Sequence, residues 1–407
     1  MWFRNALVLT ALATLGLGAA VPASGLEVAS STGATEYDAI IVGGGPAGLS
    51  ALSGLARVRR NVLLIDSGVY RNDPTRQMHD VLGFDGVRPA YFRYAARQQI
   101  AHYKTVSMVN ATVTKIEPQN NNTLFEVLTD DPTGASKTYR ARKIVLATGM
   151  RDILPATPGI KDAWGKGIYW CPWCDGHEYA DQPLGLFAPL ADVPGLVREM
   201  ITLNADVVAF VNGTDTPDAQ AATDKKFPDW RIYLDIHNVT VDNRTIERLT
   251  RLKEDKDDHD PSLPSVAHAD LFSVEFPEGQ PVERAAFLSS WPSEQASDVG
   301  EEMGVTLYGG RLAADQTKGL VTNIPGVYAI GDANSDNITN VPHALFSGKR
   351  TAVFLHVALE RENALEEIKE AKEGSKKERD LELEPRAVWE VMNGEPGEPL
   401  FAGEYRE

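Results

Sequence analysis

The sequence has few cysteines and fewer positive than negative charges, and each shortage excludes a class of protein. It also has a single long uncharged stretch. Its two cysteines are too few for a disulfide framework or an all-cysteine zinc site, and we expect no metal. The 40 Lys and Arg side chains against 57 Asp and Glu give a net charge of −17, which argues against a nucleic-acid partner. A chain of 407 residues with 43% hydrophobic residues suits two globular domains.

The uncharged stretch lies at the amino end of the chain. No charged residue occurs between Arg4 and Glu27, and apolar residues dominate before a group of small ones. This pattern is typical of a signal peptide, which we place at residues 1–20. A membrane anchor is the alternative, because a span needs ~18 residues, but two glycines and a proline shorten the apolar part. We therefore expect a secreted or lumenal protein without a membrane attachment after cleavage.

Glycosylation sequons agree with this route. Chance gives about two Asn-x-Ser/Thr motifs at this Ser and Thr usage, and the sequence has more. Glycosylation at these sites would indicate passage through an oxidising lumen. The sequons begin at Asn110, Asn121, Asn212, Asn238, Asn243 and Asn337.

A glycine-rich turn follows the first buried strand, which we predict at 37–42. Helical spacing up to residue 58 and a second apolar run at 61–66 complete a parallel β-α-β unit. In such a turn one glycine permits the bend, one lets a pyrophosphate reach the backbone, and one lets helix and strand pack closely. Asp66 ends the second strand, where a carboxylate binds ribose hydroxyls. The turn consists of Gly43, Gly44, Gly45, Pro46, Ala47 and Gly48.

Two distant motifs indicate FAD rather than NAD. Thr148 and Gly149 end another predicted strand, and Gly331-Asp332 follows Val-Tyr-Ala-Ile. Both segments resemble those of flavoproteins with two dinucleotide sites, where the second one hydrogen-bonds the ribityl chain. We therefore expect an FAD-binding domain made of residues 36–166 and 293–361.

Cys171 and Cys174 carry the chemistry, because two cysteines at this spacing close a small disulfide ring suited to redox exchange. A following helix would lower the thiol pKa through its dipole. Asp175 or His177 would then move a proton to or from the leaving thiolate. Half a zinc site is one alternative, but no second pair exists; a structural disulfide is another, though so short a ring constrains little chain entropy. The flanking tryptophans either form an apolar floor for a substrate or pack in the core.

In order and spacing these motifs resemble low-molecular-weight thioredoxin reductases over roughly residues 37–360. The segment 78–86 is similar to that of a branch that includes fungal dithiol oxidases of the gliotoxin type. The resemblance implies an α/β fold with two Rossmann-like dinucleotide-binding domains, FAD and a homodimer. It also implies that Cys174 stacks against the flavin, that Cys171 exchanges with substrate, and that Asp175 is the acid. Further cofactor contacts implied by the resemblance are Asp66, Ser67, Arg71, His79, Val113 and Val341.

The second domain, predicted at 167–292, lacks the fingerprint of the NADPH site that the resemblance implies. Ala188, Leu190 and Val193 occupy the positions of its three glycines, and a leucine side chain obstructs a pyrophosphate that must touch the backbone. No Lys or Arg lies between residues 198 and 225 to clamp a 2′-phosphate.

These losses matter because micromolar nucleotide binding needs about −8 kcal/mol, of which each charge-assisted hydrogen bond contributes ~1.5–3 kcal/mol. Electrons from a dithiol then need an acceptor other than NADPH, and molecular oxygen is the simplest.

We therefore expect an FAD-dependent enzyme that oxidises a small-molecule or peptide dithiol to a disulfide, in secondary metabolism. An NADPH-dependent thioredoxin-type reductase and a non-catalytic secreted glycoprotein are the alternatives. Outside the two domains we expect an exposed insertion at 251–265 and a charged C-terminal extension at 362–407.

Overall fold

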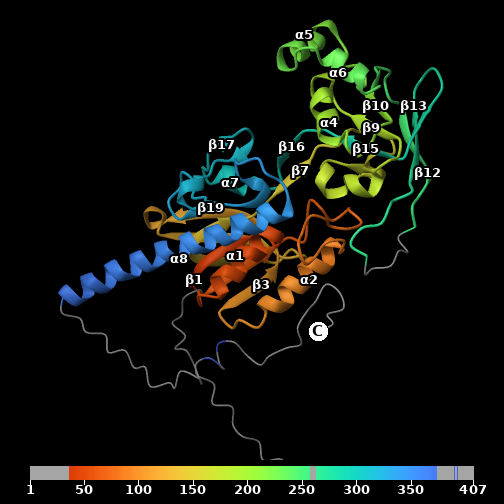
Figure 1. Ribbon diagram of the computed structural model, residues 1–407. Coiled ribbons are helices and arrows are strands. Elements are labelled where there is room, and N and C mark those ends of the chain that lie inside the picture. Colours follow the sequence, from red (N-terminus) through yellow and green to blue (C-terminus); the bar gives the residue numbers. More distant parts are fainter. Residues whose placement is uncertain (1–35, 257–262, 374–388, 390–391, 393–407) are drawn as a thin grey trace, which may run out of the picture. The chain divides into compact units, whose positions relative to one another are not determined.

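A computed structural model describes residues 36–256 and 263–373, together with Trp389 and Met392. The predicted signal peptide, part of the insertion and most of the C-terminal extension lie outside the described residues. Within them the predicted α/β fold with two Rossmann-like sheets is confirmed (Figure 1). No helix of the described part is long and apolar enough to cross a membrane.

The first sheet has seven strands in the order β3-β2-β1-β6-β5-β4, with β19 paired to β6. Parallel pairing joins β1, β2, β3, β6 and β19, while β4 and β5 extend the sheet as antiparallel strands. The strands are β1 (Glu36–Val42), β2 (Val62–Asp66), β3 (Val106–Asn110), β4 (Thr112–Gln119), β5 (Leu124–Asp130), β6 (Ser136–Leu146) and β19 (Val327–Ala329).

Alternation along β1 places one hydrophobic set on each face of this sheet. Ala39 and Ile41 pack into the cluster that contains α1 (Pro46–Ala56) and α8 (Val341–Lys372), which lie side by side (Figure 1). Ile40 and Val42 belong to the cluster on the opposite face. Burial on both faces explains why this strand is a continuous apolar run.

Helix α8 continues to Lys372 and so includes the start of the charged extension that we predict at 362–407. Its last turns contain mainly Glu, Lys and Ala, which are strong helix formers. Glu362 in this part accepts hydrogen bonds from Arg142 and Lys143 of β6. The first part of the predicted C-terminal extension is therefore an anchored helix.

The second sheet has five parallel strands in the order β11-β10-β9-β15-β8. Its helices α4 and α6 pack against it through buried residues such as Val197 and Trp230. Its strands are β8 (Ile168–Tyr169), β9 (Leu184–Phe187), β10 (Val207–Phe210), β11 (Thr240–Asp242) and β15 (Ala286–Ser289), with α4 (Val193–Met200), α5 (Pro217–Lys226) and α6 (Trp230–Ile236) between them.

The predicted insertion is not wholly a loop. Its first residues belong to β12 (Arg248–Lys253), which pairs with β13 (Leu271–Glu275) in a small antiparallel sheet completed by β14 (Val282–Arg284). Because β12 is rich in charged residues, its sequence does not resemble a buried strand. In the structure one of these charges, Arg251, pairs with the carboxylate of Asp270 at 2.6 Å.

Shorter elements complete the described chain. They are β7 (Met150–Asp152) paired with β16 (Ser293–Gln295), β17 (Leu307–Tyr308) paired with β18 (Arg311–Leu312), the helices α2 (Pro89–Ile100), α3 (Ile160–Ala163) and α7 (Val299–Glu302), and the single turns η1 (Asn120–Asn122), η2 (Pro172–Gly176), η3 (His177–Tyr179), η4 (Leu190–Asp192), η5 (Gln316–Lys318) and η6 (Gly331–Ala333).

Candidate active site

The glycine turn between β1 and α1 has the geometry of a phosphate cradle. A Cβ at Gly43, whose φ is 111°, would collide with the carbonyl oxygen of Ala147, and one at Gly48 would collide with that of Gly43. A Cβ at Gly45 would meet no atom within 4 Å. Space at Gly45, directly before Pro46 and Ala47 open α1, therefore fits a pyrophosphate at the helix N-terminus.

Polar groups around the turn fit the rest of FAD. Asp66, 2% exposed at the end of β2, accepts hydrogen bonds from the Tyr70 hydroxyl and the Arg97 guanidinium. The hydroxyl of Thr148 is buried and has no hydrogen-bond partner within the described residues. Buried polar groups are normally hydrogen-bonded, so this hydroxyl is suited to bind a ligand. A Cβ at Gly44 would overlap the Asp66 carboxylate, so this glycine lets the acid approach the turn.

Arg71 and Asp332 are brought together from positions 261 residues apart. The Arg71 guanidinium donates to Asp332 at 3.0 Å and to both oxygens of Asp152 at 2.6 and 2.8 Å. Burial raises the pKa of Asp332, although Arg71 and Arg311 oppose this shift. This ion pair aligns the Gly331-Asp332 turn with the segment after β2.

The remaining predicted cofactor contacts lie in three places. Ser67 is exposed directly after β2, and Val113 is buried in β4. Val341, the first residue of α8, packs against a small cluster around Met78. His79, with a side chain only 10% exposed, has its ring nitrogens 3.6 Å from Asp85 and 3.5 Å from Glu178.

In the second β-α-β unit, apolar side chains fill the position that corresponds to the glycine turn of the first unit. Leu190 and Val193 are fully buried and Ala188 is 7% exposed, all within the hydrophobic core of the second sheet. The backbone N–H of Leu190 already donates to the hydroxyl of Thr214 at 3.1 Å. An apolar side chain and an engaged N–H thus replace the open glycine backbone that a pyrophosphate requires.

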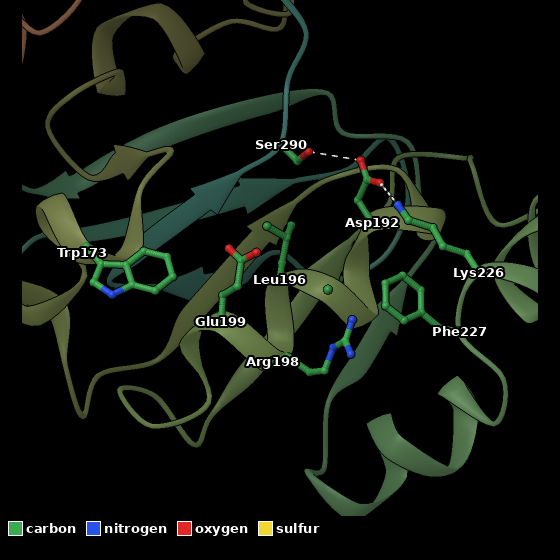
Figure 2. Close-up of a pocket in the computed structure, with 9 residues that line it drawn as sticks. Trp173, Asp192, Leu196, Arg198, Glu199, Lys226, Phe227 and Ser290 are labelled. Carbon is green, nitrogen blue, oxygen red and sulfur yellow. Dashed lines mark hydrogen bonds and ion pairs between the residues drawn. The ribbon is translucent and has the colours of Figure 1, made fainter. Parts of the chain in front are cut away.

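A surface cleft remains beside this closed turn. Its volume is ≈ 660 Å³, and Asp192 on its rim is paired with Lys226 at 3.0 Å (Figure 2). Ser290 donates a hydrogen bond to the other oxygen of the same carboxylate at 3.1 Å. Both Asp192 and Ser290 lie just beyond the carboxyl ends of neighbouring strands, β9 and β15.

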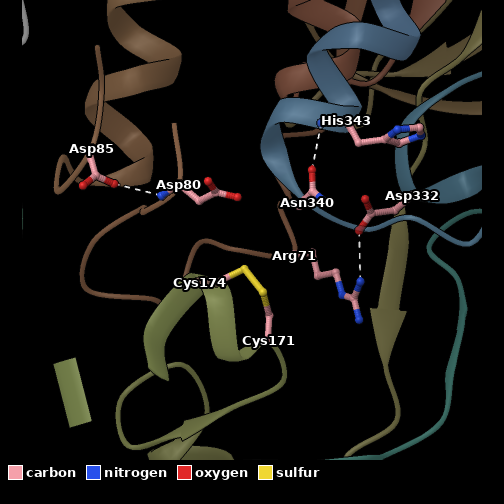
Figure 3. The surroundings of a disulfide bond; sticks show 8 residues. All are labelled: Arg71, Asp80, Asp85, Cys171, Cys174, Asp332, Asn340 and His343. Atoms are coloured by element: carbon pink, nitrogen blue, oxygen red, sulfur yellow. Dashed lines mark hydrogen bonds and ion pairs between the residues drawn. A yellow bond between two sulfur atoms is a disulfide. The ribbon is translucent and has the colours of Figure 1, made fainter. Parts of the chain in front are cut away.

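The two cysteines form a disulfide with a Cα–Cα distance of 5.2 Å (Figure 3). Cys171 precedes the π-helical turn η2, whose N–H groups at Cys174 and Asp175 donate to the Cys171 carbonyl. The helix that we expected after the pair is absent, because η2 has five residues and is followed only by the short turn η3. The turn η3 ends at Tyr179, which is buried and stacks on Tyr169. So short an element has little dipole with which to lower a thiol pKa.

The tryptophans beside the cysteines have different environments. Trp170 stacks on Trp164 at 4.8 Å between ring centroids, and the Arg71 guanidinium lies over it. Trp173, between the two cysteines, is 68% exposed. Packing therefore accounts for Trp170 and leaves Trp173 available to a ligand.

Comparisons with known proteins agree with this arrangement. The family described as pyridine nucleotide-disulphide oxidoreductase matches residues 37–192. A "Probable thioredoxin reductase" from Arthroderma benhamiae is 46% identical over 336 residues, which cover 81% of each chain. The chain belongs to the pyridine nucleotide-disulphide oxidoreductase family. It is an FAD-dependent oxidoreductase that acts on disulfides.

Other members of the family align over most of the chain. The "Thioredoxin reductase tcpT" of Claviceps purpurea is 28% identical over 76% of this chain and 90% of its own. The crystal structure of HlmI superposes with a TM-score of 0.67 and 28% identity, covering 84% of this chain and 98% of the other. The predicted family, fold class and FAD cofactor are thereby confirmed.

Asp175 has an electrostatic environment suited to proton transfer in this family member. Burial, aided by the negative charge of Glu178 and opposed by Arg76, raises the pKa of Asp175 to about 7. A carboxyl with this pKa can both donate and accept a proton at neutral pH. His177, the other predicted candidate, lies on the turn η3 with an exposed side chain.

Two groups near Asp175 were not predicted from the sequence. Glu178 is 3% exposed and accepts a hydrogen bond from Ser265. Arg76 is held by Asp270 and the Tyr179 hydroxyl. The spacing of Glu178 from the cysteines offered a weak signal for it, whereas only the tertiary fold brings Arg76 to this place.

The six sequon asparagines all have exposed side chains. Accessibility is therefore compatible with glycosylation at every predicted position.

No group of three or more His, Cys, Asp or Glu within residues 36–256 and 263–373 is arranged to hold a metal ion.

Proposed function

We propose that the protein oxidises a dithiol substrate to a disulfide through Cys171 and Cys174, with molecular oxygen as the final acceptor. The observation that carries the proposal is Leu190, fully buried where a pyrophosphate would need open backbone. The backbone N–H of Leu190 is also engaged by the Thr214 hydroxyl, so it is not free to bind a phosphate. Both features favour an acceptor other than NADPH.

The thiol chemistry balances without a further reductant. A substrate thiolate attacks one sulfur of the Cys171–Cys174 disulfide, forms a mixed disulfide and releases the other cysteine as a thiolate. Asp175, at a pKa of about 7, donates the proton that neutralises this leaving group. The second substrate thiol then displaces the enzyme, which leaves the substrate as a disulfide and the enzyme as a dithiol.

Re-oxidation of the enzyme dithiol requires an acceptor of two electrons. FAD bound at the glycine turn would supply this two-electron chemistry, with oxygen as the final acceptor. The overall reaction consumes one dithiol and one O2 and yields one disulfide and one H2O2, so that atoms and electrons balance. The chain's own contribution is to hold the cysteines, the proton donor and the cofactor.

The experiment is an anaerobic stopped-flow measurement of flavin absorbance. Dithiothreitol should bleach the flavin, air should restore it with peroxide release, and NADPH at millimolar concentration should do neither. Rapid bleaching by NADPH would overturn the proposal in favour of the reductase.

That reductase is the second candidate, because the relatives carry the name thioredoxin reductase. A binding glycoprotein without catalysis is disfavoured by the intact cysteine pair. A colourless purified protein would support it.

We further propose a secreted or secretory-lumen location. The uncharged N-terminal stretch and six exposed sequons support it, and an oxidising lumen supplies both dithiols and oxygen.

A further inference from the structure

The cleft on the second sheet is not used by the chemistry described above. It is lined by Trp173, the residue between the two cysteines, and by the outer face of α4. Helix α4 packs against the turn η2 that holds the disulfide. The cleft therefore adjoins the turn that carries the disulfide, with Trp173 as the shared residue.

The cleft lies where sheets of this type bind ligands. In open parallel sheets, ligands bind beyond the carboxyl ends of the strands, at the point where the strand order reverses. Here the chain passes from β9 through α4 to β10 on one side, while β15 returns on the other. Asp192 and Ser290, which follow β9 and β15, line the cleft at this point. The crevice is thus kept although the phosphate cradle is closed.

Some of the charged side chains in the cleft have ion-pair partners within the described residues and others do not. Asp192 is neutralised by Lys226, whereas Arg198 and Glu199 form no ion pair with any residue of the described part. Arg198 is exposed, and its guanidinium lies 4.6 Å from the centroid of the Phe227 ring (Figure 2). One cation held against an aromatic ring, with its hydrogen-bond donors unused, is suited to a single carboxylate.

The apolar part of the lining is matched to a carbon chain. Leu196 lines the cleft between Trp173 and Phe227 (Figure 2). Gly195 contributes no side chain, and a Cβ there would meet only the Phe227 ring. These surfaces leave room for an aliphatic or aromatic segment that joins a carboxylate at Arg198 to sulfur near Trp173.

We propose that this cleft is the substrate subsite and that it selects dithiols carrying one carboxylate. The carboxylate binds Arg198, and the apolar body of the substrate packs on Trp173, Leu196 and Phe227. The carboxylate of Glu199, unpaired within the described residues, disfavours a group with two negative charges, such as a phosphate. This inference rests on the proposed function and names the substrate class for it.

The test compares dihydrolipoate with dihydrolipoamide, which have the same dithiol and differ only in carboxylate against amide. Anaerobic flavin bleaching gives the kcat/KM of reduction for each. We expect dihydrolipoate to be favoured about tenfold, the effect of one charge-assisted hydrogen bond. The net charge of −17 acts against an anionic substrate, so this preference would report a local cation.

Arg198→Gln should bring the ratio of the two kcat/KM values close to one. Arg231→Gln removes an exposed arginine of the same sheet region that pairs with Asp224 outside the cleft, and it should keep the wild-type ratio. Trp173→Ala should lower kcat/KM for both dithiols, because it removes the surface shared by their apolar parts.

The outcomes separate the two proposals. If neither dithiol bleaches the wild-type flavin, the proposed function fails and the subsite fails with it. If both bleach it at equal efficiency and Arg198→Gln changes nothing, the function stands and the subsite is wrong. Competition by NADPH against dihydrolipoate that disappears in Arg198→Gln would assign the cleft to a nucleotide and overturn the subsite.

Discussion

At the scale of single residues, Asp175 has the clearest functional consequence. Its raised pKa of about 7 means that the folded protein holds the proton more tightly than the unfolded chain does. We expect dithiol oxidation to fall above pH 7, as the donor ionises. Asp175→Asn should abolish this fall above pH 7 (the alkaline limb of the pH profile) and should lower the rate itself about 100-fold. Glu178→Gln should move the limb to lower pH, because it removes a negative charge that raises the pKa. An unchanged pH profile in Asp175→Asn would exclude the acid role.

The same shift predicts the sign of a stability effect. A raised carboxyl pKa contributes stability fully below the unfolded value of 3.8, and that contribution is lost as the pH rises through about 7. Asp175→Asn, which never ionises, should therefore gain in melting temperature relative to wild type at pH 8 and not at pH 4.

Gly45 separates cofactor binding from folding. Because a Cβ there meets no protein atom within 4 Å, Gly45→Val should fold with near wild-type stability and yet lose FAD, since the side chain fills the space for the pyrophosphate. Flavin absorbance relative to protein, together with circular dichroism, measures both. Gly48→Val is the comparison, and it should lose fold and flavin together. Full flavin content in Gly45→Val would contradict the assigned cradle.

At the scale of elements, the extension of α8 gives a stability prediction. Lys143, 6% exposed in its side chain, has its partner Glu362 at 2.5 Å. Glu362→Ala should lower the free energy of unfolding by about 1–2 kcal/mol, because it leaves a buried ammonium unpaired. Glu366→Ala, an exposed acid on the same helix without an ion pair in the described part, should cost little. Urea denaturation followed by circular dichroism compares them, and equal losses would show that the ion pair contributes nothing.

Elements with buried, continuous apolar runs could be predicted, and charged ones could not. The strands β1 and β2 were predicted from hydrophobic runs that end at glycine or aspartate. Strand β12 and the end of α8 were missed because their charges are satisfied by partners distant in sequence, such as Asp270 and Lys143. The residues that flank a charged position in the sequence do not identify the distant residue that pairs with it.

The same limit applies to the site. Motifs revealed the cysteines, the glycine turn and Asp66, because each depends on short spacing. The cleft with Arg198 and Lys226 could not be predicted, since α4 and α5 place these side chains together only in three dimensions.

At the scale of the whole molecule, the proposed route through the secretory pathway has a direct test. Expression in a secreting eukaryotic host should yield a heavier protein that an amidase specific for N-linked glycans converts to a lighter one, because all six asparagines are accessible. Single Asn→Gln variants then map occupancy by mass spectrometry. A protein retained inside the host at its unmodified mass would contradict the route.

The buried leucine in the second sheet also bears on how the protein can change over evolutionary time. Replacing a fully buried leucine by a smaller residue costs ~2–5 kcal/mol, and whole domains retain only about 5–15 kcal/mol of net stability. Leu190 is such a residue, so a mutation back toward glycine would weaken the fold before any nucleotide could bind. Since no Lys or Arg lies between residues 198 and 225, where a 2′-phosphate would be clamped, no single step would be rewarded. Under the proposed function, descendants of this sequence would therefore diversify in the thiols that donate electrons, and they would not acquire NADPH as a donor by single substitutions.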